Sequence, residues 1–128
     1  MKHRVLVVED STVIQRLIEI CLRPAGFDVV FASEGRSALA IADETPIDLV
    51  LLDVGLPDIP GWEVLTGLRA AENTKDVTVL MLTGDARPET GQKAKELGAN
   101  AVLTKPFRPN ELREICLRLA ASSVPLTA

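Results

Sequence analysis

Short apolar runs alternate with amphipathic segments along this chain, and the alternation occurs five times. Runs such as Leu49-Val50-Leu51-Leu52 have no polar residue at alternate positions, a pattern typical of strands buried on both faces of a sheet. In the segments between them, apolar residues recur at helical spacing, as at Val13, Leu17 and Cys21. The predicted strands are residues 4–8, 28–31, 48–52, 78–82 and 101–103, and the predicted helices are residues 11–23, 35–44, 62–72, 87–97 and 110–121.

The number and spacing of these units predict the class of fold. Five strand–helix units in 128 residues leave about 25 residues per unit, close to the minimum for a crossover between parallel strands. Such crossovers are right-handed, and a closed barrel needs about eight units, so we expect an α/β fold with a doubly wound open sheet and helices on both faces. One domain accounts for residues 1–121, and we expect residues 122–128 to be a frayed tail or the stub of a linker.

Composition and charge limit the partners. The chain has 14 Lys and Arg against 18 Asp and Glu, a net charge of −4, and no concentrated basic face, so we expect no direct nucleic-acid partner. Every apolar run is far shorter than the roughly 20 residues of a membrane span, and no signal peptide is evident. We therefore expect a cytoplasmic protein without a membrane partner. Cys21 and Cys116 belong to no CxxC pair and are expected to be small buried side chains.

Polar side chains follow four of the five predicted strands. The first strand leads into Glu9-Asp10, the third into Asp53, the fourth into Thr83-Gly84-Asp85 and the fifth into Thr104-Lys105-Pro106. In a doubly wound sheet, ligands bind outside the carboxyl ends of the strands. Each residue alone has an ordinary structural explanation, such as a helix cap for Asp10 or a solvated cation for Lys105. Their convergence on one edge predicts a functional site there.

The residue types at this edge indicate metal-assisted phosphoryl chemistry. Clustered carboxylates without a neighbouring Cys or His form a hard, all-oxygen site, which favours Mg²⁺ (or Mn²⁺) over zinc. Protein-bound Mg²⁺ keeps part of its water and usually meets phosphate oxygens. Lys105 would neutralise one such oxygen, and the Thr83 hydroxyl or the Gly84 N–H could donate to another. Asp53, on the middle strand, is the candidate nucleophile that accepts the phosphoryl group.

Competing chemistries lack their motifs. No phosphate-binding P-loop or dinucleotide fingerprint follows the first strand, and there is no G-x-S-x-G elbow. The single histidine, His3, precedes the first strand, so a serine triad would have no base.

Four motifs occur in order along the chain. They are Val5-Leu6-Val7-Val8-Glu9-Asp10, Leu49-Val50-Leu51-Leu52-Asp53-Val54-Gly55-Leu56-Pro57 with Gly61, Leu80-Met81-Leu82-Thr83-Gly84 and Leu103-Thr104-Lys105-Pro106-Phe107. The intervals between Asp10, Asp53, Thr83 and Lys105 are 43, 30 and 22 residues. Over residues 4 to about 121, the chain closely resembles a response-regulator receiver domain of two-component signalling, similar to the single-domain chemotaxis regulators.

The resemblance implies a fold and a function. The fold would be flavodoxin-like, with the five parallel strands in the order 2-1-3-4-5. Asp53 would accept a phosphoryl group from a sensor histidine kinase or a histidine phosphotransfer protein, and the domain would then change its binding to a downstream partner. Thr83 would be the switch hydroxyl, and Lys105 would pair with the phosphoryl group. A cis peptide bond between Lys105 and Pro106 would direct the ammonium group inward. Such a domain is a signalling switch and not an enzyme, since it catalyses only its own phosphorylation and dephosphorylation.

The same resemblance implies a metal site. Asp10 would bind Mg²⁺ directly and Glu9 through water, together with Asp53 and the backbone carbonyl of Gly55.

One position departs from the pattern of the family. Three residues before Lys105 the family usually has Tyr or Phe, and this chain has Val102. The aromatic ring normally swings inward when the switch hydroxyl moves, whereas valine is smaller and has one dominant rotamer. Phosphorylation is unaffected by this change, but the relay to partners must differ, and Gly91 in the fourth helix is a candidate source of mobility.

Two alternatives remain open from the sequence. One is a protein-interaction module of the same fold that works without phosphate, against which the intact set of site residues argues. The other is a small-molecule phosphatase with an aspartyl-phosphate intermediate, which turnover of external phosphomonoesters would reveal.

Overall fold

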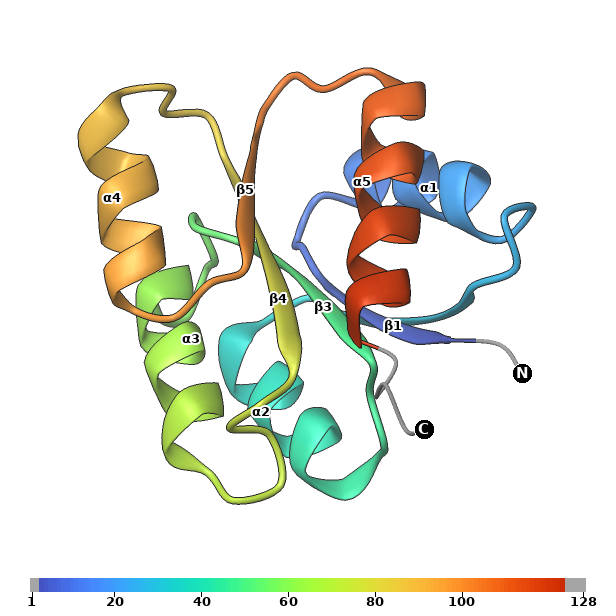
Figure 1. Ribbon diagram of the computed structural model, residues 1–128. Helices are drawn as coiled ribbons and strands as arrows, with labels where there is room; N and C mark the ends of the chain where they lie inside the picture. Colours follow the sequence, from blue (N-terminus) through green and yellow to red (C-terminus); the bar gives the residue numbers. More distant parts are fainter. Residues whose placement is uncertain (1–2, 124–128) are drawn as a thin grey trace.

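In residues 3–123, which the computed structural model describes, five parallel strands alternate with five helices (Figure 1). The elements are β1 (Arg4–Val8), α1 (Thr12–Leu22), β2 (Asp28–Ala32), α2 (Gly35–Glu44), β3 (Leu49–Asp53), α3 (Gly61–Ala70), β4 (Thr78–Thr83), α4 (Pro88–Glu96), β5 (Ala101–Thr104) and α5 (Pro109–Ser123). The strand order is β2-β1-β3-β4-β5. The predicted doubly wound α/β sheet in the order 2-1-3-4-5 is therefore confirmed.

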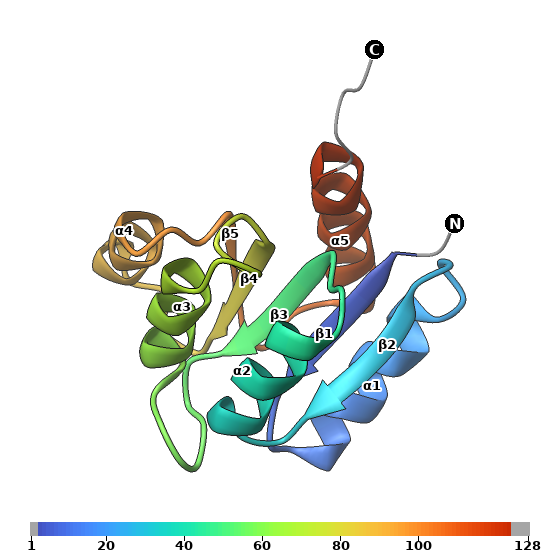
Figure 2. The same cartoon turned by 90° about the horizontal axis from the view of Figure 1, so that it is seen from below.

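Helices cover both faces of the sheet. Figure 2 shows α1 and α5 on one side and α2, α3 and α4 on the other. Alternate residues of the central strands divide between the two layers: Val5 and Val7 of β1 pack under α1 and α5, while Leu6 and Val8 pack under the other three helices. Each fully buried leucine or valine stabilises the fold by roughly 1.5–3 kcal/mol relative to exposure. Both faces of β1, β3 and β4 are used in this way, which accounts for their uninterrupted apolar runs.

Local signals set the ends of the first helix. Ser11 caps α1, because its Oγ accepts a hydrogen bond from the Ile14 N–H at 3.3 Å. The turn after α1 contains Gly26, whose φ of 96° lies in the left-handed region that glycine tolerates.

Several boundaries differ from the predicted ones. The strands β3, β4 and β5 each include one more polar residue, Asp53, Thr83 and Thr104, because ladder hydrogen bonds need only the backbone and continue to the pairs Asp53↔Leu82 and Thr83↔Thr104. Helix α3 ends at Ala70 rather than at residue 72. The buried Thr74 hydroxyl donates to the Leu68 carbonyl at 2.6 Å and turns the chain there.

The ends of the chain are described only in part. Helix α5 continues to Ser123, two residues beyond the predicted end, and the rest of the expected tail, residues 124–128, lies outside the described residues. Cys21 and Cys116 are both buried free thiols, as predicted. Among the residues described, none of the helices combines the length and the apolar character that crossing a bilayer requires.

The glycine that begins α3 should be sensitive to substitution. A Cβ at Gly61 would contact the carbonyl oxygen of Asp53 and would lie 2.8 Å from the Cα of Val54, both backbone atoms that cannot move aside. We expect Gly61→Ala to lower the free energy of unfolding in urea by about 1–3 kcal/mol. Gly91, within α4, is the matched control because a Cβ there meets nothing within 4 Å. Gly91→Ala should raise stability by about 0.5–1 kcal/mol, and equal effects of the two substitutions would contradict this packing.

Candidate functional site

Three carboxylates meet at the carboxyl edge of the sheet, the upper edge in Figure 1. Glu9 and Asp10 follow β1, and Asp53 ends the neighbouring strand β3, so the parallel pairing of β1 with β3 brings them together. One carboxylate oxygen from each of the three lies within 4.8 Å of the others. Glu9 and Asp53 are buried, whereas Asp10 is exposed. The cluster is thus a half-enclosed, all-oxygen site that opens to solvent on the side of Asp10.

Lys105 supplies a positive charge to this cluster. Its Nζ donates to Oε1 of Glu9 at 2.6 Å and lies 3.1 Å from Oδ1 of Asp53. The Lys105 backbone N–H donates to the Thr83 carbonyl at 2.7 Å, and the peptide bond to Pro106 is cis, as the resemblance implies. The loop after β5 therefore directs an ammonium group across the edge of the sheet toward β1 and β3.

The electrostatics of the cluster follow from burial and from these contacts. Burial raises the pKa of Glu9, and the nearby Asp53 charge adds to this, while hydrogen bonds from Lys105 and from the Ser11 N–H only partly offset the rise. Burial alone would lower the pKa of Lys105. The hydrogen bond to Glu9 and the charges of Asp53 and Glu9 outweigh burial, so the Lys105 pKa is raised. With three carboxylates facing one ammonium, the site keeps a net negative charge that a hard divalent cation would neutralise.

Thr83 lies at the end of β4, and its hydroxyl is engaged with the β4–α4 loop. The Thr83 Oγ1 accepts a hydrogen bond from the Asp85 N–H at 3.0 Å. The Asp85 carboxylate accepts in turn from Nη2 of Arg87 at 2.7 Å and from the hydroxyl of Thr90 at 2.8 Å. The guanidinium of Arg87 beside it holds the pKa of Asp85 well below its usual range. Because Thr90 belongs to α4, hydrogen bonds link the switch hydroxyl predicted from the sequence to the start of that helix.

Two other predicted positions are less constrained. Gly55 lies two residues beyond Asp53, exposed in the β3–α3 loop, and apart from its chain neighbours no atom lies within 4 Å of the place that a Cβ would occupy. Its role as a carbonyl ligand stays a prediction. Val102 is half-buried in β5 and packs with the core beneath α2, α3 and α4.

A cavity of about 260 Å³ adjoins Thr83 between the start of α3 and α4. Trp62 and Lys93 both line it, and the Lys93 Nζ lies 4.7 Å from the centre of a Trp62 ring, within the range of a cation–π interaction. The indole therefore sits where movement of α4 would change its surroundings.

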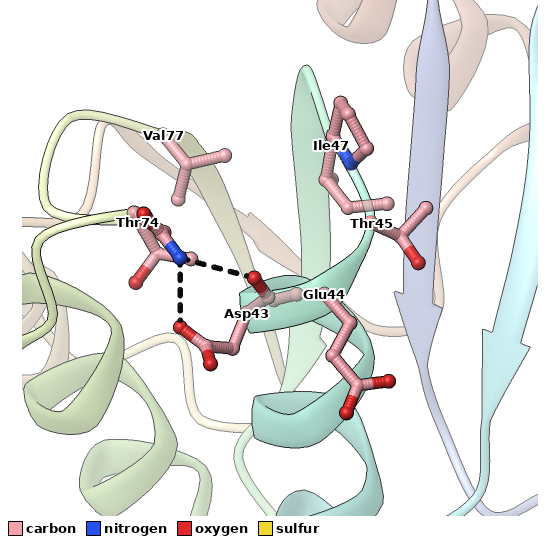
Figure 3. Close-up of a pocket in the computed structure, with 9 residues that line it drawn as sticks. Asp43, Glu44, Thr45, Ile47, Thr74 and Val77 are labelled. Carbon is pink, nitrogen blue, oxygen red and sulfur yellow. Dashed lines mark hydrogen bonds between the residues drawn. The ribbon is translucent and has the colours of Figure 1, made fainter.

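A second cavity, of about 370 Å³, lies at the opposite edge of the sheet (Figure 3). Ile47 and Val77 lie on either side of it. The side chain of Asn73, which lines the cavity, donates to the Oδ1 and the backbone carbonyl of Asp43, both at 3.1 Å. These polar groups are paired with one another, and none of the carboxylates of the acidic cluster reaches this cavity.

The structure brings together four of the residues selected from the sequence, Glu9, Asp10, Asp53 and Lys105. The sequence reasoning missed two side chains that hold the adjoining loops, Asp85 with its bonds to Arg87 and Thr90, and Asp58 with its bonds to the start of α2. The sequence indicated Asp85 only as a further acidic residue after the fourth predicted strand. Asp58 had no signal in the sequence beyond its place in a turn-rich loop.

Removal of the Lys105 charge should destabilise the metal-free protein. In Lys105→Met, Glu9 and Asp53 would face each other without a cation. We expect the free energy of unfolding to fall by about 1–3 kcal/mol, less than for a fully enclosed pair because Lys105 is 22% exposed. Urea unfolding in the presence of a chelator measures this. Added Mg²⁺ should restore most of the loss, since it replaces the missing positive charge.

The matched control is Lys75→Met, because Lys75 pairs with Glu72 at 3.3 Å between well-exposed side chains, and it should change stability by less than about 0.5 kcal/mol.

The contribution of Lys105 to stability should fall at high pH. The Lys105 pKa is raised in the fold, so its contribution is complete below the ordinary value of 10.5 and is lost as pH rises through the higher folded value. A difference between wild type and Lys105→Met that grew in alkaline solution would contradict this arrangement.

Comparison with known proteins places this arrangement in a family. The response regulator receiver domain family matches residues 5–117. The DNA-binding dual master transcriptional regulator RpaA of Synechocystis is 38% identical over 109 residues, which are 85% of this chain and 45% of that protein. The chain spans about half the length of the curated relatives that it matches. Because RpaA is a DNA-binding regulator, the relatives give no support to the expectation that nucleic acid is excluded as a partner.

Solved structures agree in fold. The chemotaxis response regulator CheY4 of Vibrio cholerae superposes with a TM-score of 0.88 at 35% identity, covering 93% of this chain and 99% of that one. The receiver domain of a sensor histidine kinase of Pseudomonas aeruginosa, which has a magnesium ion coordinated in its active-site cleft, gives a TM-score of 0.86 at 32% identity, covering 94% and 99%. Receiver domains are signalling switches that pair with histidine kinases and bind Mg²⁺ in an acidic pocket. By its matched sequence and by its fold, this chain belongs to the response regulator receiver domain family of two-component signalling.

Proposed function

We propose that Asp53 accepts a phosphoryl group from a sensor histidine kinase or a histidine phosphotransfer protein, and that this modification changes the binding of a partner protein. One observation carries the proposal: the carboxylate that ends the central strand lies 3.1 Å from an ammonium and within 4.8 Å of two further carboxylates. These surroundings suit a nucleophilic carboxylate, because the phosphorylated product carries extra negative charge that the ammonium and a bound cation would neutralise.

Each residue of the site has a separate role in the proposed phosphoryl transfer. An oxygen of Asp53 attacks phosphorus, the bond between phosphorus and the donor's imidazole nitrogen breaks, and its electron pair returns to the imidazole. Lys105, already 3.1 Å from Asp53, pairs with an oxygen of the transferred group, and the N–H of Gly84, an exposed residue, is a candidate further donor. The buried side chains of β3 anchor in both layers of the core the strand that Asp53 ends.

The acidic cluster fits Mg²⁺. Glu9, Asp10 and Asp53 provide hard oxygen ligands, and the exposed side of the cluster leaves room for water and phosphate oxygens. When bound, Mg²⁺ supplies charge neutralisation for the phosphoryl oxygens. The receiver domain of the Pseudomonas kinase, with magnesium in its active-site cleft, supports this assignment for the present chain.

The switch would pass through the β4–α4 loop. A phosphoryl group on Asp53 offers the Thr83 hydroxyl a charged acceptor in place of its present contact with the Asp85 N–H. Once that contact breaks, the loop that Asp85 ties to Arg87 and Thr90 can shift together with the start of α4. Val102, packed in the core, offers no swinging aromatic ring, so the loop carries the response in this chain.

The first test is the intact mass of the protein after incubation with acetyl phosphate and Mg²⁺. We expect one added phosphoryl group in wild type, its absence in Asp53→Asn, and its absence when a chelator removes Mg²⁺. Asp48→Asn is the matched control, since Asp48 is an exposed acid at the opposite end of β3, and it should be modified like wild type.

The absence of an adduct from both acetyl phosphate and a phosphorylated histidine donor, in a protein that is folded by circular dichroism, would overturn the proposal. It would favour an interaction module that works without phosphate. Rapid release of phosphate from external phosphomonoesters would instead indicate a phosphatase.

The role of Thr83 can be separated from phosphorylation itself. In Thr83→Ala we expect the adduct to form at a level within about twofold of wild type, because Asp53 and Lys105 are untouched, while the structural response is lost. Fluorescence of Trp62, which contacts Lys93 of α4, is the measurement. Thr83→Ser keeps the hydroxyl and should retain the response. An unchanged fluorescence response in Thr83→Ala would show that the hydroxyl does not drive the switch.

A further inference from the structure

The first turn of α2 lacks a cap of its own. The residue that precedes it, Glu34, has extended backbone angles, and its side chain makes no capping hydrogen bond. The first N–H groups of a helix have no partner within the helix and must find one elsewhere. Here the partner comes from another loop: Oδ1 of Asp58 accepts from the Gly35 N–H at 2.8 Å, and Oδ2 accepts from the Arg36 N–H at 2.9 Å. Residues more than 20 positions apart are thus joined by two charge-assisted hydrogen bonds.

Asp58 belongs to the loop that leaves the phosphoacceptor strand. This loop is closed at its base, where the Gly61 N–H donates to the Val54 carbonyl at 2.8 Å and the Val54 N–H donates to the Leu82 carbonyl at 3.0 Å. The base is therefore fixed to the sheet directly beside Asp53.

Gly55, in the middle of the loop, is less enclosed than this base. Gly55, the predicted carbonyl ligand, is exposed, and a Cβ there would meet nothing within 4 Å. Leu56, the next residue, is partly buried on the core beneath α2, α3 and α4. The next side-chain hydrogen bonds along the loop are those of Asp58. Its neighbour Ile59 packs so closely on Gly35 that a Cβ there would lie 2.6 Å from Cγ1 of Ile59. Gly55 is thus held between the base of the loop and the contact of Asp58 with α2.

We propose that Asp58 is a positioning residue: by tying the β3–α3 loop to the first turn of α2, it holds the Gly55 carbonyl where a cation bound by Glu9, Asp10 and Asp53 can use it. This inference rests on the proposed function and extends it to a residue outside the acidic cluster. The first turn of α2 serves as the fixed point, because Gly35 is buried against Ile59 and Val64 and because Ala38 belongs to the core beneath α2, α3 and α4. Partners that orient metal ligands typically contribute about 10- to 100-fold to metal affinity.

A purely structural role must be distinguished from positioning, since Asp58→Ala removes a helix cap as well as a tether. The double variant Asp58→Ala/Glu34→Ser separates the two. Serine at position 34 can cap α2 from within the helix, which restores the helix without restoring the link to the loop. Asp48→Ala is the control for the loss of a carboxylate that accepts a backbone hydrogen bond, because Asp48 accepts from the Arg4 N–H at 2.7 Å at the opposite edge of the sheet.

Three measurements are made on each folded protein: the dissociation constant for Mg²⁺ by titration calorimetry, stability by urea unfolding, and amide exchange at Gly61 without metal. We expect Asp58→Ala to weaken Mg²⁺ binding by about tenfold, to lower stability and to speed exchange at Gly61. The double variant should regain stability but not Mg²⁺ affinity, and Asp48→Ala should bind Mg²⁺ like wild type.

The other outcomes are equally clear. Wild-type Mg²⁺ affinity in Asp58→Ala would overturn the inference and leave the proposed function standing. Recovery of both stability and Mg²⁺ affinity in the double variant would also overturn it, because Asp58 would then act only as a helix cap. If wild type itself bound no Mg²⁺, the proposed function would fail and this inference with it.

Discussion

The contact of Lys105 with two buried carboxylates is the interaction on which the site depends. Glu9 and Asp53 lie side by side at the ends of adjacent strands, and two ionised carboxylates in partly dehydrated surroundings repel each other strongly. One ammonium group, 96 residues from Glu9 along the chain, makes that arrangement tolerable. This ammonium group does not neutralise the cluster completely, since it faces three carboxylates. The cluster therefore keeps a negative charge that a divalent cation would neutralise.

The strands that carry this cluster are anchored in the core of the protein. The strands β1, β3 and β4 are buried on both faces, so the backbone beneath Glu9, Asp53 and Thr83 cannot relax to separate the charges. Stabilisation by the two cores offsets the cost of dehydrating the acids.

Two carboxylates outside the cluster, Asp85 and Asp58, connect the loops at this edge to neighbouring helices. Asp85 connects Thr83, the proposed switch residue, to Arg87 and to Thr90 on α4, which links the β4–α4 loop to the site. Asp58 fastens the β3–α3 loop to α2. One loop is thus coupled to a group that would move on phosphorylation, and the other is tied to a helix that packs on the sheet. With valine at position 102, the proposed response to phosphorylation passes through the first of these loops.

The sequence by itself determined the alternation of strands and helices, the class of sheet and the edge at which the polar residues gather. It could do so because apolar periodicity and the order of elements are local properties, and because parallel strands place all their carboxyl ends on one side. The same reasoning identified four site residues from the sequence, because each lies close to the end of a recognisable strand: Glu9, Asp10, Asp53 and Lys105. Only the tertiary structure decided that the Thr83 hydroxyl accepts from Asp85, that Asp58 caps a helix more than 20 residues away, and that the strands continue into Asp53, Thr83 and Thr104. Hydrogen bonds between distant segments leave no periodic trace in the sequence, because they depend on how loops of particular length meet in space and not on the pattern of apolar positions.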